Sequence, residues 1–120
     1  MCSDATDVTE YIDQQPAEWQ PSLRGLRDGR LAAPAGHREA MRYAMPAYLD
    51  GDEVTVGFAK QARCLSLHIA KASVLDAHRG RLTGLDVGKG CVRSRRPDQV
   101  DWSVVGDLRS ATASSPEAPC

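Results

Sequence analysis

Two neighbouring segments with strict two-residue alternation constrain this chain more than any other feature. The first, EVTVGFA at 53–59, places Val, Val and Phe on one face, and the second, RCLSLHI at 63–69, places Leu, Leu and Ile on one face. Alternation of this kind is typical of strands with one buried face. Because only residues 60–62 separate the two, we expect an antiparallel hairpin. A turn at 50–53 and a strand at 47–49 are expected before it.

Helical patterns surround these strands. The segments at 7–15, 20–34 and 36–43 are predicted as helices, the first with Asp7 and Glu10 as a capping box. The third must end before Pro46, because the residue preceding a proline avoids helical angles. Further along the chain we expect a helix at 71–82 capped by Ser73, a turn at 88–90, a strand at 91–95 and a helix from Asp101 to 111.

Clustered strands flanked by helices indicate an α+β fold. We expect a small two-layer sandwich, with an antiparallel sheet and the N- and C-terminal helices packed on one face. The length of 120 residues fits one domain. We place that domain at 7–112, with a frayed N-terminus at 1–6 and a tail at 113–120 that is disordered by composition.

Charge and hydropathy narrow the function classes. The net charge is −1, which does not favour a nucleic-acid binder. It divides unevenly, because residues 1–59 hold 5 basic and 10 acidic side chains whereas residues 60–120 hold 10 and 6. This asymmetry either persists in the fold or vanishes if the two halves interleave. No apolar run reaches the ~18 residues of a membrane span, and no signal-peptide pattern opens the chain, so we expect a cytoplasmic protein with reduced thiols.

Four stretches carry a family resemblance. They are VTEYI (8–12), LRGLRDGRLAAP (23–34), EAMRYAMPAYLDGDEVTVGFA (39–59) and GKGCVRSRRPDQVDW (88–102). In this order they resemble the YdhG-like domain family, which is catalogued as domain of unknown function 1801. The resemblance spans roughly residues 7–112.

The resemblance implies a small α/β sandwich that has been compared with frataxin. It also implies iron as a candidate ligand, since at least one relative has been proposed as an intracellular iron chaperone. The chain departs from the family pattern at Gly25 and Gly29, which replace larger residues, and at Ser94, where a large aromatic is common. We expect these changes to open the core or a pocket.

Two acidic groups are the candidate metal ligands. Their members are Asp7, Glu10 and Asp13 in the first helix and Asp50, Asp52 and Glu53 in a turn. Hard cations such as iron prefer carboxylate oxygens, and the two groups would share a cation if the turn folded beside the helix. The alternative is a solvated helix start and an ordinary Asp-rich turn.

The segment YAMPAY at 43–48 concentrates scarce large side chains and supplies the pocket candidates. These are Tyr43, Met45, Pro46 and Tyr48, with Lys89 and Arg93 from a glycine-rich turn and the strand after it. Backbone amides and cations near such a turn could hold a small anion. The alternative is structural. Met45 with one tyrosine fills the space between helices and sheet, and the basic residues protect a sheet edge.

No catalytic constellation is recognisable. Cys64 and His68 lie four residues apart on one strand, about 13 Å along its axis, so they cannot act together, whereas a pairing with Cys91 stays open. We therefore expect a non-catalytic cytosolic binding protein, with a metal ion or small anion as ligand and no certain cofactor. The alternatives are an unrecognised enzyme site near Met45 and a homodimeric interaction module that uses a sheet face or edge.

Overall fold

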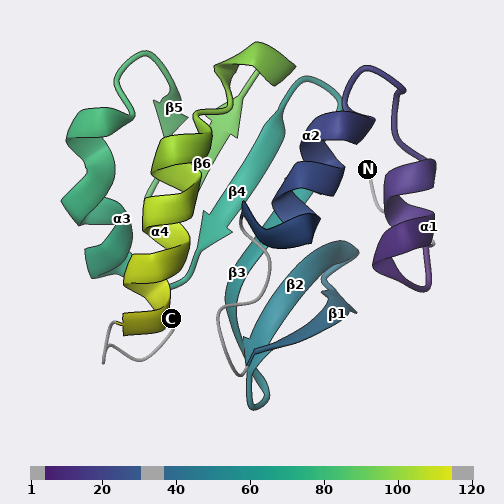
Figure 1. Cartoon of the computed structure of the whole chain (residues 1–120), viewed down its shortest axis with the longest axis horizontal. Coiled ribbons are helices and arrows are strands. Elements are labelled where there is room, and N and C mark those ends of the chain that lie inside the picture. The colour runs from purple at the N-terminus through teal and green to yellow at the C-terminus, as the bar shows by residue number, and fades with distance from the viewer. Residues whose placement is uncertain (1–4, 31–36, 115–120) are drawn as a thin grey trace.

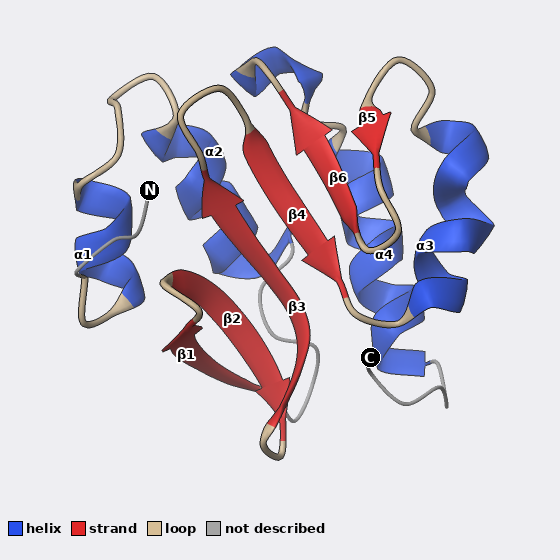
Figure 2. Ribbon diagram, turned by 180° about the vertical axis from the view of Figure 1, so that it is seen from behind, coloured by secondary structure: helices blue, strands red, loops and turns tan. Residues whose placement is uncertain are grey.

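The computed structural model describes residues 5–30 and 37–114. Within them the chain forms two layers, an antiparallel sheet and a layer of helices that covers one of its faces (Figure 1). Seen from behind, the strands lie in front of α2 and α4 (Figure 2). The predicted α+β sandwich with helices on one face is confirmed.

The sheet has six strands in the order β1-β2-β3-β4-β6-β5. Their bounds are Arg38–Arg42 (β1), Met45–Asp50 (β2), Glu53–Lys60 (β3), Leu65–Ile69 (β4), Asp86–Val87 (β5) and Cys91–Ser94 (β6). The hairpin expected from the alternating segments is β3–β4, in which Gly57 lies opposite His68. The strands expected at 47–49 and 91–95 are β2 and β6.

The α-helices are α1 (Val8–Asp13), α2 (Gln20–Gly25), α3 (Ala72–His78) and α4 (Trp102–Ser114). Short turns of other helix types are η1 (Leu26–Arg30), η2 (Arg79–Arg81) and η3 (Pro97–Gln99). Asp7 caps α1 by accepting from the Glu10 amide at 2.8 Å, and Asp101 caps α4 by accepting from the Ser103 amide at 3.0 Å, as predicted. The predicted Ser73 cap is wrong, because α3 starts after Lys71 without a side-chain cap.

Two predicted boundaries differ from the structure. The helix expected at 20–34 ends as an α-helix at Gly25 and continues as a π-helical turn to Arg30, and the rest of it lies outside the described residues. The final helix extends to Ser114, so residues 113 and 114 are helical. The remaining residues of the expected tail and residues 1–4 of the expected frayed end lie outside the described part of the chain.

The helix predicted at 36–43 is wrong, because residues 38–42 form strand β1. Tyr43 and Ala44 both adopt positive φ, 53° and 60°, which makes a two-residue turn whose twist matches that of a hairpin. Pairing with β2 gives this segment backbone hydrogen bonds along its whole length. An isolated helix of this length is marginal without tertiary packing, so the hairpin wins.

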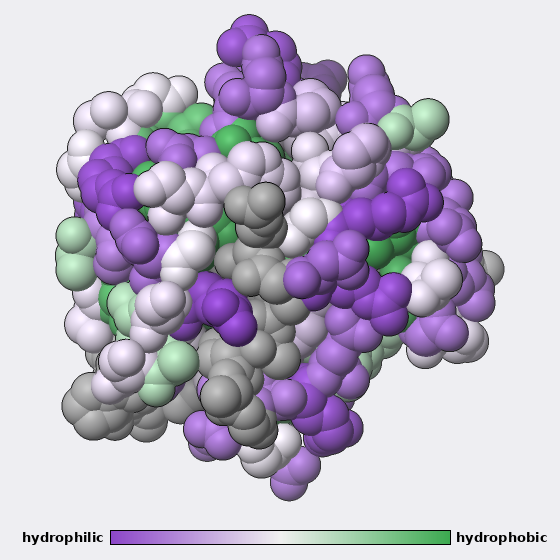
Figure 3. All heavy atoms as spheres, in the orientation of Figure 1, coloured by the Kyte–Doolittle hydropathy of each residue, from purple (hydrophilic) through white to green (hydrophobic). Residues whose placement is uncertain are grey.

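The core lies between the sheet and the helices. Val56 and Phe58 on β3 and Leu67 on β4 point into it and are buried. The outer side of the helix layer is mainly hydrophilic, with hydrophobic residues in small patches (Figure 3). The opening expected at Gly25 is absent: a Cβ there would lie 2.9 Å from the Trp102 ring, which already fills the space. Ser94 is also buried.

The two halves of the sequence stay apart in the fold. Residues before 60 supply α1, α2 and strands β1 to β3, and residues after 60 supply strands β4 to β6 with α3 and α4 (Figure 1). The halves therefore do not interleave across the sheet. The charge asymmetry of the sequence survives as an acidic side and a basic side of the molecule.

Candidate functional site

The sheet face that no helix covers has small residues at its centre. Residues directly opposite each other on paired strands share a face. One such row crosses five strands, and its members are Ala40, Ala47, Gly57, His68 and Cys91. Three of these five residues are alanine or glycine, and two of them, Ala47 and Gly57, are buried although no helix covers them.

A groove of about 920 Å³ lies on the open face. Residues around the β1–β2 turn form one wall, β3 and β4 form the floor, and the β5–β6 turn forms the opposite wall. The residues that matter for its chemistry are Arg42, Tyr43, Met45, Ala59, His68 and Lys89. Asp52, in the β2–β3 turn, and Glu53, the first residue of β3, also line the groove.

Met45 and Gly57 shape the groove by direct contact. Met45 is 8% exposed, and its Cε lies 3.0 Å from the place where a Cβ on Gly57 would stand. The carbonyl oxygen of Pro46 lies equally close to that place. A glycine in a strand often marks such a close approach of another chain segment. Because Gly57 has no side chain, the thioether of Met45 can lie against β3.

Tyr43 stands at the rim of the groove. The β1–β2 turn leaves this residue 86% exposed, and it is the exposed large hydrophobic residue of the described chain. A single exposed hydrophobic residue is ordinary on a protein surface, but this one also lines the groove. Tyr43 therefore offers an aromatic ring and a hydroxyl to anything that enters the groove.

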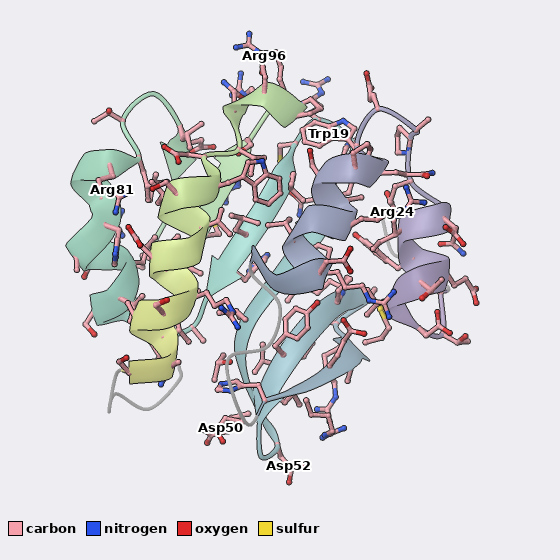
Figure 4. All side chains as sticks on the ribbon, viewed as in Figure 1. Trp19, Arg24, Asp50, Asp52, Arg81 and Arg96 are labelled. Carbon is pink, nitrogen blue, oxygen red and sulfur yellow. The ribbon has the colours of Figure 1, made fainter. Side chains whose placement is uncertain are left out.

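Most arginines of the basic side are already neutralised by nearby acids. Arg79 pairs with Asp76, Arg81 with Asp107, Arg93 with Asp86 and Arg96 with Asp98. Arg81 and Arg96 are labelled in Figure 4. By contrast, neither Arg42 nor Lys89 forms an ion pair with a residue that the structure describes. The groove thus carries two cations with unused hydrogen-bonding capacity.

The surroundings of His68 favour the neutral form of its imidazole. Burial lowers the pKa of its imidazole, and the positive charge of Arg93 lowers it further. Its Nε2 lies 3.4 Å from the hydroxyl of Ser66. Ser66 is only 2% exposed, so this hydroxyl cannot meet a substrate. His68 therefore lines the groove, whereas its neighbour Ser66 does not.

The structure divides the residues that the sequence grouped as pocket candidates. Tyr43, Met45 and Lys89 line the groove. Pro46 is buried, and Arg93 borders a second, smaller hollow of about 410 Å³. Tyr48 lies on the helix-covered face of the sheet, so it does not join them.

Tyr48 belongs to a polar cluster beneath the helices. It is 1% exposed, and its hydroxyl donates to Glu39 at 3.0 Å. Burial and the neighbouring Glu39 carboxylate both raise the pKa of Tyr48 far above its usual value. Arg27 donates two hydrogen bonds to the same carboxylate, at 3.2 and 3.0 Å. This tyrosine therefore joins β1, β2 and η1 and has a structural role.

The acids of the first helix have local partners. Asp7 caps α1, Glu10 accepts from the Thr6 hydroxyl at 3.2 Å, and Asp13 lies 3.6 Å from the Arg24 guanidinium. Each of these contacts is explained by the helix or its neighbour. None of them needs a metal.

The two acidic groups do not meet. Asp50 and Asp52 lie at the tip of the β2–β3 hairpin, away from α1 (Figure 4). Among residues 5–30 and 37–114, no three of the His, Cys, Asp and Glu residues gather into a group that could hold a metal ion. The condition for sharing one cation, that the turn lies beside the first helix, is therefore not met among the described residues.

The groove also contains residues that sequence reasoning missed. Arg42 was missed because its segment was predicted as a helix, although Arg38, Ala40 and Arg42 alternate with Glu39 and Met41 as a strand would. His68 and Cys91, whose pairing the sequence left open, are direct neighbours on β4 and β6. Cys64 lies elsewhere, with its thiol 3.4 Å from Gln61 Oε1.

Comparisons with known proteins address the fold. No known family profile matches the chain, and no curated protein matches it. The structure is similar to that of YdhG from Bacillus subtilis, a protein of the domain-of-unknown-function 1801 family, with a TM-score of 0.68 and 13% identity. The match covers 86% of this chain and 85% of that one. The chain therefore has the fold of the family that its sequence resembles.

No helix within the described residues has both the length and the apolar character to cross a bilayer.

Proposed function

We propose that this protein binds a small organic anion in the groove on the open face of the sheet. The observation that carries the proposal is the pair of cations, Arg42 and Lys89, that line the groove without ion-pair partners among the described residues. A volume of about 920 Å³ falls in the range of small-molecule sites, roughly 300–1,000 Å³.

The lining fits a ligand with one charged end and one apolar body. Met45 and Ala59 offer apolar surface, whose burial is favourable for any hydrocarbon part of a ligand. A guanidinium and an ammonium are strong donors to carboxylate, sulfonate or phosphate oxygens. Asp52 and Glu53 repel an anion from the start of β3, and Arg42, which pairs with Met45 beside the other end of β3, attracts it there, so the charged group of the ligand should lie nearer Arg42 than the two acids.

Binding is favoured over catalysis by what the groove contains. Its imidazole, His68, has a buried serine as neighbour, and that serine is out of reach of a ligand. Iron handling rests on the family resemblance alone, because the candidate carboxylates are dispersed. Anaerobic calorimetry with Fe(II) tests iron handling directly, and a binding heat above buffer would support it. Self-association through the open face would compete with the ligand for the same surface.

The first experiment follows backbone amide shifts by NMR during titration with 1-naphthoate and, separately, with its neutral counterpart 1-naphthalenemethanol. We expect shifts clustered at residues 42–45, 59–61, 68–70 and 89–90, and tighter binding of the anion. Lys89→Ala and Arg42→Ala should each weaken the binding of 1-naphthoate by roughly three- to tenfold.

Arg63→Ala is the matched control. Arg63 is exposed in the β3–β4 connection, has no ion pair with a described residue and does not line the groove. Its removal should leave affinity nearly unchanged. If no clustered shifts appear at millimolar ligand, or if Arg63→Ala weakens binding as much as Lys89→Ala, the groove is not an anion site.

A further inference from the structure

The turn that carries Tyr43 is built in an unfavourable way. Two-residue hairpin turns with positive φ at both central positions favour Asn-Gly, because L-residues with a Cβ are strained there. This turn uses Tyr43 and Ala44, with φ of 53° and 60°. A positive φ at a bulky residue is a genuine outlier.

In the rest of the described chain, the residues with positive φ are glycines. Gly51, in the β2–β3 turn, has φ of 64°, and Gly84, before β5, has φ of 86°. Within the described residues, only at the rim of the groove do residues other than glycine adopt such angles. Backbone strain that a chain avoids elsewhere is a pointer to function where it persists.

The strained turn places the aromatic ring of Tyr43 at the groove. Tyr43 stands 86% exposed and lines the groove together with Arg42 and Met45. Its ring covers little of the protein's own surface, so burial of the side chain does not repay the strain. An exposed aromatic ring at the edge of a groove is well suited to stack on another planar ring.

We infer that Tyr43 recognises a planar aromatic ligand whose acidic group is attracted by the two cations of the groove, Arg42 on the wall of Tyr43 and Lys89 on the opposite wall. The ligand class is thus an aromatic carboxylate or a similar aromatic anion. This inference rests on the proposed function, because it names the kind of anion that the groove takes. Met45 borders the same wall and offers a polarisable thioether to the edge of an aromatic ring.

The experiment compares 1-naphthoate with decahydronaphthalene-1-carboxylate, which has the same carbon skeleton and charge but no aromatic ring. Affinities are taken from amide-shift titrations of the wild type, Tyr43→Phe, Lys89→Ala and the double variant Tyr43→Asn/Ala44→Gly. The wild type should prefer the aromatic anion by roughly three- to tenfold. Tyr43→Phe should keep that preference, and Lys89→Ala should weaken both ligands alike.

The double variant separates the two proposals. It should raise the melting temperature, because Asn-Gly suits the turn, and yet reduce the aromatic preference to about one. Tyr43→Ala serves as a second variant that should lose the preference without the gain in stability. If the preference persists in both variants while the groove still binds anions, the inference about Tyr43 is wrong and the proposed function stands. If neither anion shifts the groove residues of the wild type, both are wrong.

Discussion

The two faces of the sheet are made by the same strands, and they differ in kind. On the covered face, Phe58 and Leu67 lie opposite each other and are buried beneath the helices. On the open face, the neighbouring pair is Gly57 and His68. Successive strand residues point to opposite faces, so one strand can supply core on one side and a hollow on the other. The difference teaches that stability and binding can be changed separately in this molecule.

The largest expected effect is on the covered face. Phe58→Ala should lower the free energy of unfolding by about 3–5 kcal/mol, because it removes a fully buried ring from the core. Urea denaturation measures this loss. The matched change on the open face, Ala59→Ser, should alter stability by less than about 0.5 kcal/mol. Equal losses of stability at positions 58 and 59 would show that the covered and open faces do not differ in their contribution to stability.

A smaller effect is expected where the open face is tightest. Gly57→Ala should destabilise the protein by about 1–3 kcal/mol, because the added methyl meets Met45 and the Pro46 carbonyl. Met45→Ala in the same chain should relieve only the side-chain part of the clash, since the Pro46 oxygen is backbone. A double-mutant cycle measures the coupling between residues 45 and 57. Additive effects would mean that the two residues do not touch.

Tyr48→Phe tests the assignment of the two tyrosines to opposite faces. It removes one hydrogen bond to Glu39 beneath the helices, so we expect a loss of about 1 kcal/mol in stability. Because Tyr48 does not line the groove, the affinity for 1-naphthoate should not change. Tyr43→Phe, the matched variant on the open side, should change stability very little. A loss of ligand affinity in Tyr48→Phe would place this tyrosine in the site.

The sequence correctly predicted those elements that are determined by local patterns. Alternation located β3 and β4, and side-chain caps located the starts of α1 and α4. Strand β1 was missed because its spacing also suits a helix, and the decision depends on pairing with β2 and on the positive φ of Tyr43 and Ala44. Long-range pairing and backbone strain leave no periodic signal.

The candidate site was predicted in part for the same reason. YAMPAY and the 88–90 turn supplied Tyr43, Met45 and Lys89, but the segment alone did not show that Tyr48 faces the other way. A one-residue shift in strand parity exchanges the faces, so the side on which each tyrosine lies is set by the register of β2. Arg42 could be found only once its segment was known to be a strand.

The smallest expected effect concerns His68, the imidazole in the floor of the groove. Burial, with help from Arg93, holds the pKa of His68 below its ordinary value of 6.5. The unfolded chain therefore binds a proton at this residue more readily than the folded protein does. The resulting stability is present above pH 6.5 and falls as the pH drops through 6.5 towards the folded-state pKa.

A variant without the titrating group should lose this dependence. We expect the melting temperature of the wild type to fall more between pH 7.5 and pH 5.5 than that of His68→Gln. Arg93→Ala should reduce the difference, because it removes the repulsive charge and lets the folded-state pKa rise. If His68→Gln and the wild type respond to pH alike, the imidazole is solvated in both states. The open face would then be less enclosed at His68 than the groove requires, which links this small effect back to the contrast between the two faces.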